Sequence, residues 1–471
     1  MEHYLVRFVA AFILVSLLAG CVAIGTPSAS PASPTSPPPP TPLPPSPTPL
    51  PPSPTPLPSP TPNEPVTIKL MSWFPGLPVG KGEEALIEQF TQSHAGLTID
   101  RGQMTTWEPY PYIRGESSAG DTPADLVTNA PDIFMLKSVE RDELVDMSEL
   151  WQQTGLVESL PAAMQTFAAV NGKQYYMPYG LSWAAVYYNK AVFEQYGLTP
   201  PTTWDEFLAI CETLKQKDEI ALAIPGQHWF PDSLWFDYLD IRINGAEFHR
   251  QLQNGEIPFT DERVRTVLET WQKLFLDGFV HPKSANMGSP QALGSLVRSN
   301  DFALEPQKAA MMLARSDQLL GLPQKYHSEL GFFAFPIIDP SVPRGEVIHI
   351  LSYLLPKKAE YSEAALGYAE SIVSLESQQA LVEAGIGLIL VHPGIDLTAL
   401  ESDMQQGRAL LDQAEDFSVV FFLMPESMYY SANSAVNSFI QNPEKLDELI
   451  KRLEEARQQA LKNGDFVHQT N

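Results

Sequence analysis

Hydrophobic positions in the first part of the globular region repeat with two different periods. Val66–Trp73 alternates apolar and polar residues, which predicts a strand, and Glu83–Ser93 carries apolar residues at helical spacing, which predicts a helix. Residues 131–135 form a short apolar run, which predicts another buried strand. A strand, a loop and a helix in this order are typical of an α/β domain.

Helical patterns dominate the rest of the chain. Thr203 and Glu206 have the spacing of a capping box, which predicts a helix start at Thr203. Apolar stripes closed by a glycine predict three further helices, at Arg263–Asp277, at Ser362–Glu383 and from Asn442 to Gly464. Helices outnumber strands and alternate with them, so we expect an α/β fold in two parts.

The first twenty residues have the features of an export signal. Arg7 precedes a short apolar run, Phe8–Leu18, which is too short to span a membrane comfortably. The following Leu18-Ala19-Gly20-Cys21 resembles the bacterial lipobox. We therefore expect residues 1–20 to be a lipoprotein signal peptide and Cys21 to carry the lipid, at the extracellular face of the plasma membrane. The alternative is an ordinary secreted protein with a chance cysteine.

Residues 21–65 form a linker in which Pro, Ser and Thr predominate from Thr26 onward. Proline fixes φ and donates no backbone hydrogen bond, so we expect polyproline II or disorder here. At about 3.1 Å per residue, such a segment could reach on the order of 120 Å. This length would hold a globular body away from a membrane.

Composition narrows the classes of function. The 471 residues leave roughly 400 after the linker, which suits two lobes. The net charge of −26 argues against a nucleic-acid partner. With Cys21 assigned to lipid, Cys211 cannot form an intrachain disulfide, and we expect it in the core. The nine histidines are scattered, and no nucleophile-elbow, metalloprotease or phosphate-loop motif occurs, so we expect no cofactor, metal or catalytic residue.

A central block resembles a known family. The block contains Asn171–Tyr179, Val186–Lys190 and Pro200–Phe207, and it is similar to the central signature of family 1 extracellular solute-binding proteins of ABC importers. Weaker matches keep the family's order, at 130–133, 308–311, 331–336 and 424–430. The resemblance covers about residues 66–462.

The resemblance implies a two-lobed periplasmic-binding-protein-like (type II) fold with a hinge. Lobe one would hold 66–180 with about 350–396, and lobe two 181–349 with about 397–471. The chain segments that cross between the lobes would lie near Pro178–Ser182 and Ile348–Ser352. The insert at 108–129 and departures such as Gln307 leave the ligand and loop geometry open.

In such a fold a ligand lies between the lobes, and a sugar needs aromatic platforms with planar polar partners. The candidate ligand-binding residues are aromatic side chains at predicted strand ends and loops, together with one carboxylate and one guanidinium: Trp73, Trp107, Asp132, Trp183, Trp229, Trp235, Arg315, Tyr353 and Tyr430. Each aromatic could instead pack in the core, Asp132 could cap a turn, and Arg315 could form a surface salt bridge.

These observations favour a monomeric, non-enzymatic lipoprotein that captures a carbohydrate, a mono- or oligosaccharide, and delivers it to ABC transporter permease subunits. Its contact with the membrane would be the lipid anchor. A wall-tethered glycoside hydrolase would share the export signal, the linker and the aromatics, but it needs two suitably spaced carboxylates. The same fold could also bind a non-sugar solute.

Overall fold

The computed structural model describes residues 65–467, with gaps at 76–79, 107, 118–121, 161–168, 227–233, 298–307, 386–387, 390, 393, 397, 399 and 420–423. The strands are β1 (Val66–Ser72), β2 (Leu97–Gln103), β3 (Leu126–Asn129), β4 (Met177–Asn189), β5 (Ile220–Leu222), β6 (Ala309–Arg315), β7 (Leu330–Phe333), β8 (Gly345–Leu354) and β9 (Asp416–Val419).

Helices connect and cover these strands. Those before β5 are α1 (Gly80–Ser93), α2 (Tyr110–Arg114), α3 (Ile133–Glu140), α4 (Ser148–Gln153), α5 (Leu156–Ser159), α7 (Lys190–Tyr196) and α8 (Trp204–Gln216). Those between β5 and β7 are α10 (Trp235–Asn244), α11 (Ala246–Gln253), α12 (Glu262–Leu276), η1 (Ser284–Asn286), α13 (Ser289–Leu296), η3 (Ser316–Gly321) and η4 (Gln324–Glu329). The last are α14 (Ser362–Ile372), α15 (Leu375–Glu383), α16 (Ser402–Asp412), α17 (Glu426–Gln441) and α18 (Leu446–Asn463).

The described strands pair in the order β2-β1-β3-β8-β4-β6-β5, with β7 on β4 and β9 on β8. The pairs β1–β2, β1–β3, β5–β6 and β8–β9 are parallel, and the pairs β3–β8, β4–β8, β4–β6 and β4–β7 are antiparallel. Helices interleave with the strands along the chain, as the fold class α/β requires. The predicted fold class is therefore confirmed.

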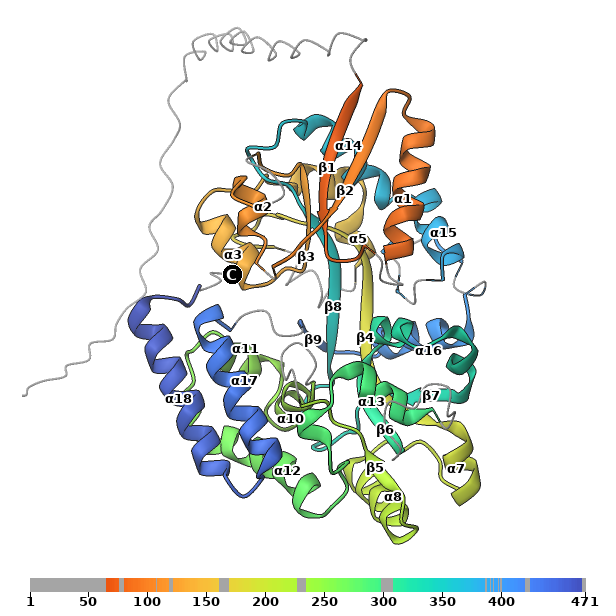
Figure 1. Ribbon diagram of the computed structural model, residues 1–471, viewed down its shortest axis with the longest axis vertical. Coiled ribbons are helices and arrows are strands. Elements are labelled where there is room, and N and C mark those ends of the chain that lie inside the picture. The colour runs from red at the N-terminus through yellow and green to blue at the C-terminus, as the bar shows by residue number, and fades with distance from the viewer. Residues whose placement is uncertain are drawn as a thin grey trace, which may run out of the picture. The chain divides into compact units, whose positions relative to one another are not determined.

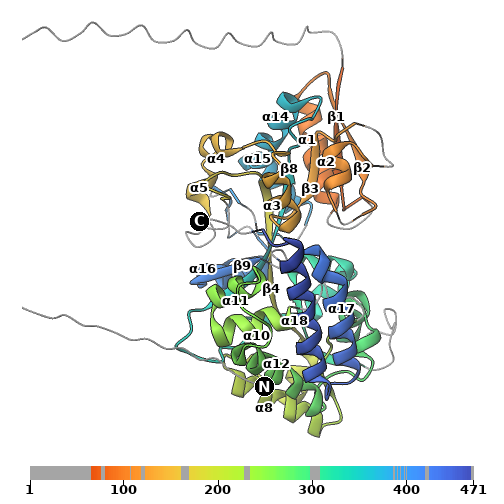
Figure 2. The ribbon, with the colours of Figure 1, turned by 90° about the vertical axis from the view of Figure 1, so that its left-hand side faces the viewer.

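Two long strands, β4 and β8, run between two groups of elements (Figure 1). The first part of β4, Met177–Trp183, pairs with β8, and the second part, Ala184–Asn189, pairs with β6 and β7. Figure 2 shows the same two strands joining the groups from the side. The paired stretch coincides with the crossings that the sequence predicts near Pro178–Ser182 and Ile348–Ser352.

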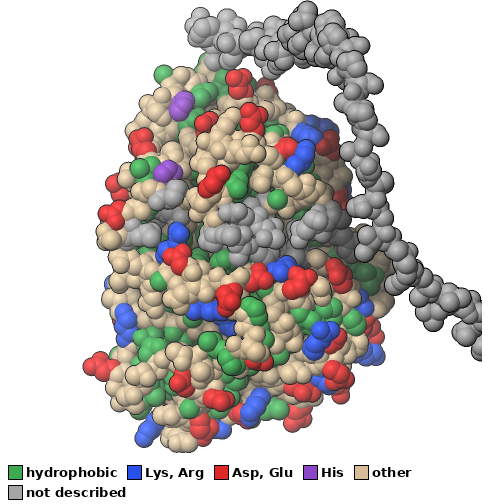
Figure 3. All heavy atoms as spheres, turned by 180° about the vertical axis from the view of Figure 1, so that it is seen from behind, with side chains coloured by type: hydrophobic (Ala, Val, Ile, Leu, Met, Phe, Trp, Pro, Cys, Tyr) green, Lys and Arg blue, Asp and Glu red, His purple; other side chains and the backbone are tan. Residues whose placement is uncertain are grey.

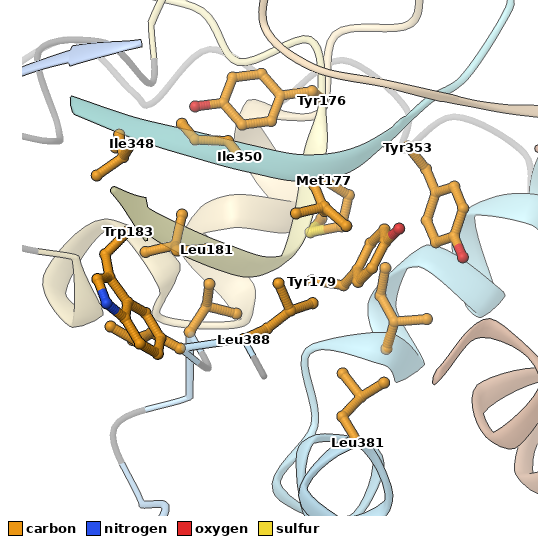
Figure 4. Packing of buried hydrophobic residues seen from close by; sticks show 14 of the residues in the cluster. Tyr176, Met177, Tyr179, Leu181, Trp183, Ile348, Ile350, Tyr353, Leu381 and Leu388 are labelled. Atoms are coloured by element: carbon orange, nitrogen blue, oxygen red, sulfur yellow. The ribbon is translucent and has the colours of Figure 1, made fainter. Parts of the chain in front are cut away.

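Buried side chains form two hydrophobic clusters. One surrounds β1, β3 and the paired stretch of β4 and β8, and the other surrounds β5, α8, α10, α12, α17 and α18. In Figure 4, Tyr179, Leu181 and Trp183 of β4 face Leu388, and Tyr353 lies beside Tyr179. The Tyr179 and Tyr353 rings stack with centroids 4.9 Å apart. Buried side chains therefore cover the paired stretch of β4 and β8.

Several predicted elements are confirmed. The strand at Val66, the helix ending at Ser93 and the helix over 263–277 are present as β1, α1 and α12. Thr203 caps α8, and Glu206 completes the capping box. Cys211 is fully buried in the core, as expected, and burial raises the pKa of its thiol.

Other predicted elements are wrong in detail. The strand expected at 131–135 is the start of helix α3, because Asp132 caps its N-terminus, and the strand lies earlier, at β3. The long helix over 362–383 is two helices, since Ser374 breaks it and caps α15. The final helix begins at Leu446 rather than beside Pro443, although Gly464 ends it in the left-handed conformation as predicted.

The signal peptide, Cys21 and most of the linker lie outside the described residues. Within the part of the chain that the structure describes, no helix combines the length and the apolar character that a membrane crossing requires. The division into lobe one and lobe two stays a prediction.

Candidate ligand-binding site

The carboxyl ends of three neighbouring parallel strands meet at one edge of the sheet. Strand β1 pairs with β2 on one side and with β3 on the other. Its end is followed by Trp73, the end of β2 leads to Glu108, and the end of β3 leads to Asp132. Such an edge is where open α/β sheets bind ligands.

The Asp132 carboxylate connects the end of β3 to the start of α3. Oδ1 accepts hydrogen bonds from the Met135 amide and from Asn129 Nδ2, both at 2.9 Å. The side chain is 4% exposed, and burial raises its pKa to about 7, although these hydrogen bonds act in the opposite direction. Capping α3 is therefore an observed role of Asp132, and a contact with a sugar hydroxyl stays a prediction.

The N-terminus of α17 meets the same edge. Glu426 is the first residue of α17, and Glu108 is near enough to affect its carboxyl group. Burial, followed by Glu108, raises the pKa of Glu426 to about 7.

Tyr110, the first residue of α2, lies between these acidic groups. Its hydroxyl is buried and has no hydrogen-bond partner among the described residues. Burial raises its pKa, and the nearby Asp132 and Glu426 carboxylates raise it further. The guanidinium groups of Arg114 and Arg141 lie 4.7 and 5.1 Å from the centre of its ring.

Two of the predicted aromatic side chains retain exposed surface here. Trp73 is half-buried, and Tyr430 is 72% exposed one turn after Glu426 on α17. We use the name junction for six residues that lie at or just after the ends of β1, β2 and β3 or in the first turns of α2 and α17: Trp73, Glu108, Tyr110, Asp132, Glu426 and Tyr430. It combines aromatic surface with carboxyl and hydroxyl groups, the chemistry that a polyhydroxylated ligand requires.

The loop that follows β5 starts beside the same helix. Asn437 of α17 donates from Nδ2 to the carbonyl oxygen of Gly226 at 2.7 Å. Trp229 in that loop lies outside the described residues, as does Trp107 in the loop after β2. Their predicted contacts with a ligand stay predictions.

Three predicted aromatics lie inside the protein. Trp183 is 2% exposed, Trp235 is 1% exposed and Tyr353 has no exposed surface. Trp183 packs against Phe332, Trp235 contacts Phe335, and Tyr353 donates its hydroxyl to Glu83 Oε1 at 3.1 Å. In this conformation they cannot offer a ring face to a ligand, so they are not included in the junction.

Arg315 takes part in a buried salt bridge at the crossing strands. Its Nε lies 3.0 Å from Asp317 Oδ1, and its side chain is 11% exposed. The pair is largely buried, in contrast to the surface salt bridge considered from the sequence. Whether Arg315 also contacts a ligand stays a prediction.

Reasoning from the sequence did not select Glu108, Tyr110 or Glu426. Tyr110 and Glu108 lie in the unusually long insert at 108–129, and Glu426 directly follows the Met424-Pro425 element. The sequence features that could have pointed to these residues are the insert at 108–129 and the Met424-Pro425 element beside them. Among the described residues, no group of three or more His, Cys, Asp and Glu side chains could hold a metal ion.

Charge on the surface is mixed. Figure 3 shows one face, on which Asp and Glu side chains lie among Lys and Arg. Ion pairs among the described residues, such as Arg250–Asp416 and Arg265–Asp447, also join opposite charges. On that face the acidic excess of the chain is spread out rather than gathered into one patch.

Comparison with known proteins identifies the family. The model for bacterial extracellular solute-binding proteins matches residues 85–410, and the chain therefore belongs to this family. The chain is 23% identical over 333 residues to a probable sugar-binding periplasmic protein of Mesorhizobium japonicum, covering 66% of this chain and 75% of that protein. It is 23% identical over 266 residues to an uncharacterized ABC transporter extracellular-binding protein of Pyrococcus horikoshii, covering 54% of this chain and only 56% of that protein.

Solved structures share the fold. AcbH, a bacterial solute receptor described as preferring β-D-galactopyranose exclusively, has a TM-score of 0.70 at 22% identity, covering 83% of this chain and 98% of that chain. RafE in complex with raffinose has a TM-score of 0.65 at 17% identity, covering 83% of this chain and 98% of that chain. The two-lobed solute-binding fold expected from the sequence is thereby confirmed.

Proposed function

We propose that this protein captures a carbohydrate outside the cytoplasm and delivers it to the permease of an ABC importer. The junction is the observation that carries the proposal, because an exposed tyrosine and a half-buried tryptophan accompany carboxyl and hydroxyl groups at the ends of its elements. Relatives described as sugar-binding, among them the multiple sugar-binding protein of Streptococcus mutans, support this ligand class.

The proposed ligand lies between two lobes that close around it. Lobe one would hold residues 66–180 and about 350–396, and lobe two would hold 181–349 and about 397–471. Closure favoured by the ligand requires tighter binding to the closed form. A closed form also gives a permease one shape to recognise.

The proposed location is the extracellular face of the plasma membrane, with Cys21 carrying the lipid. Each buried methylene of a lipid chain contributes about 0.8 kcal/mol to membrane binding. Replacing Cys21 with serine should release the protein from the membrane fraction into the medium. Retention of the variant on the membrane would contradict the anchor, but not the ligand class.

The protein is proposed to bind its ligand without chemical change. A hydrolase would need two carboxyl groups separated by about 5 Å or more. No observation in the described residues favours the hydrolase alternative.

A thermal-shift screen against neutral mono- and oligosaccharides tests the proposal. A ligand at one hundred times its Kd stabilises the folded state by about 2.7 kcal/mol, which raises Tm measurably. Tyr430→Ala should reduce that shift, while Tyr196→Ala on α7 serves as a control tyrosine outside the junction. A positive shift with amino acids or peptides, and none with any saccharide, would favour a different solute.

A further inference from the structure

A buried carboxyl group is connected to the turn that carries Trp73. The Ser72 hydroxyl, at the end of β1, donates to Glu83 Oε2 of α1 at 2.5 Å and accepts a hydrogen bond from the Phe74 amide at 3.0 Å. The Ser72 carbonyl oxygen accepts from the Met104 amide at 2.8 Å. The backbone is therefore fixed on both sides of Trp73, whose own side chain is half-buried.

Arg101 of β2 connects the same carboxyl group to the start of α1. Its Nη1 donates to the carbonyl oxygen of Gly80 at 2.9 Å and lies 3.4 Å from Glu83 Oε2. Its Nη2 donates to Glu84 Oε1 at 2.6 Å. A Cβ on Gly80 would overlap the carbonyl group of Phe74. Phe74 and Gly80 therefore approach each other closely, one on each side of the segment that connects β1 to α1.

These polar groups lie in the interior of the protein. Glu83 and Ser72 are buried, and the Arg101 side chain is mostly buried. Burial raises the pKa of Glu83, and its contacts with Ser72, Arg101 and Tyr353 act in the opposite direction. A buried polar group that loses its partner is costly, because water does not replace the lost hydrogen bond. The contacts therefore favour one conformation of the turn at Trp73.

We propose that Glu83 is a positioning residue for Trp73 and acts through Ser72. Arg101 keeps the Glu83 carboxyl group in place. A sugar packs its apolar face against an aromatic ring, and a ring that is already held in one place loses less conformational entropy on binding. The contact of Trp73 with a sugar rests on the proposed function, whereas the fixation of Trp73 by Glu83 does not.

The alternative is a purely structural role for Glu83. Its other oxygen, Oε1, accepts from the Tyr353 hydroxyl of β8 at 3.1 Å. The two carboxyl oxygens therefore allow the two roles to be tested separately. Removing the Tyr353 hydroxyl should change stability and leave Trp73 in place, whereas removing the Ser72 hydroxyl should release Trp73 from its position.

Fluorine NMR on the ligand-free full chain, with 5-fluorotryptophan at its eight tryptophan positions, tests this role. Trp73→Phe assigns the Trp73 signal, and the remaining signals report whether the fold is intact. Ser72→Ala and Glu83→Ala should shift or broaden the Trp73 signal. Tyr353→Phe should leave it unchanged, and so should Ser93→Ala, a matched serine at the exposed end of α1. A Trp73 signal unchanged in both Ser72→Ala and Glu83→Ala would overturn the proposal.

Affinity for the saccharide that shifts Tm most in the thermal-shift screen is the second readout. Ser72→Ala should weaken its binding by roughly threefold to tenfold, and Ser93→Ala should not. When Trp73→Ala is already present, Ser72→Ala should cause no further loss, because the effects of coupled residues are not additive. An equal loss with and without Trp73→Ala would overturn the positioning role. If the parent protein binds no saccharide, the proposed function fails, and the fluorine signal still tests the fixation of Trp73.

Discussion

The hydroxyl of Ser182 donates a hydrogen bond to Asp317 Oδ1 at 2.7 Å. Ser182 lies on β4 opposite His349 of β8, and Asp317 lies in the turn that follows β6. Arg315 donates to the same carboxylate, and His349 Nδ1 lies 3.9 Å from it. The Asp317 carboxylate thus connects β4 to the end of β6, and it lies close to β8.

Removing that carboxylate should destabilise the fold. Burial alone would raise the pKa of Asp317, but Arg315, His349 and Ser182 outweigh burial and hold the pKa at about 2. Asp317→Ala leaves Arg315 without this partner, and we expect a loss of about 3 kcal/mol in the free energy of unfolding, measured by urea denaturation.

The matched control is an exposed ion pair. Arg408 and Asp412 form an i,i+4 pair on α16 with half-exposed side chains. Asp412→Ala should change the free energy of unfolding by less than about 0.5 kcal/mol. Equal losses in Asp317→Ala and Asp412→Ala would contradict a special role for Asp317.

A glycine in α16 makes room for Trp183. A Cβ on Gly407 would lie 2.6–2.8 Å from three atoms of the indole ring, which is closer than packed atoms allow. Gly407→Ala should therefore cost about 1–3 kcal/mol through overpacking. Urea denaturation measures this cost as a lower midpoint concentration, with no change in the slope of unfolding free energy against urea concentration.

Gly367, inside α14, is the control glycine, since a Cβ there would meet nothing within 4 Å. Gly367→Ala should stabilise the protein by roughly 0.5–1 kcal/mol, because alanine loses less conformational entropy in a helix. Opposite signs for the two substitutions are the expected result. Stabilisation by Gly407→Ala would contradict the described packing.

His249 should make stability depend on alkaline pH. The imidazole lies between Asp237 and Asp240, with contacts of 3.3 and 2.8 Å, and is buried. Burial lowers its pKa, but the two carboxylates outweigh burial and raise it to about 9. Because the pKa is raised on folding, the stabilisation is complete below about 6.5 and is lost as the pH rises through about 9.

The comparison that isolates this effect uses His249→Gln. The difference in free energy of unfolding between the parent and this variant should shrink from pH 6 to pH 9.5, measured by urea denaturation at each pH. A flat difference for His249→Gln would show that the imidazole is neutral.

Substitutions at Tyr353 and Tyr430 should have different effects: the first should change stability, and the second should change ligand binding. The Tyr353 hydroxyl is buried against Glu83, whereas the Tyr430 side chain is 72% exposed. Tyr353→Phe should lower the free energy of unfolding by about 1 kcal/mol and leave sugar affinity unchanged. Tyr430→Ala should leave stability within about 0.5 kcal/mol and weaken binding in calorimetry. The reverse pattern would place the ligand at the buried ring.

Local patterns predict most of the scaffold, and helix caps that compete with the apolar periodicity explain the exceptions. The stripe of α12 and the capping box at Thr203 need only neighbouring residues, so the sequence predicts them well. Asp132 and Ser374 are caps whose signals compete with the apolar runs around them. In both places the cap decides the boundary that periodicity alone misses.

The candidate site was less predictable than the fold. An aromatic residue near a strand end can face a ligand or the core, and the sequence does not distinguish Tyr430 from Trp235. Glu108 lies near Glu426, although the two belong to distant segments, and no local pattern encodes this proximity. Which distant residues become neighbours depends on the tertiary fold, and a single sequence does not determine these pairs.

The most direct test of the central claim is recovery of the ligand after binding. The protein is equilibrated by dialysis with the saccharide that shifts Tm most, and mass spectrometry analyses that saccharide on both sides of the membrane. We expect saturable retention of one saccharide per chain, with its mass unchanged after prolonged incubation. Cleavage products, or no retention of any saccharide, would contradict it.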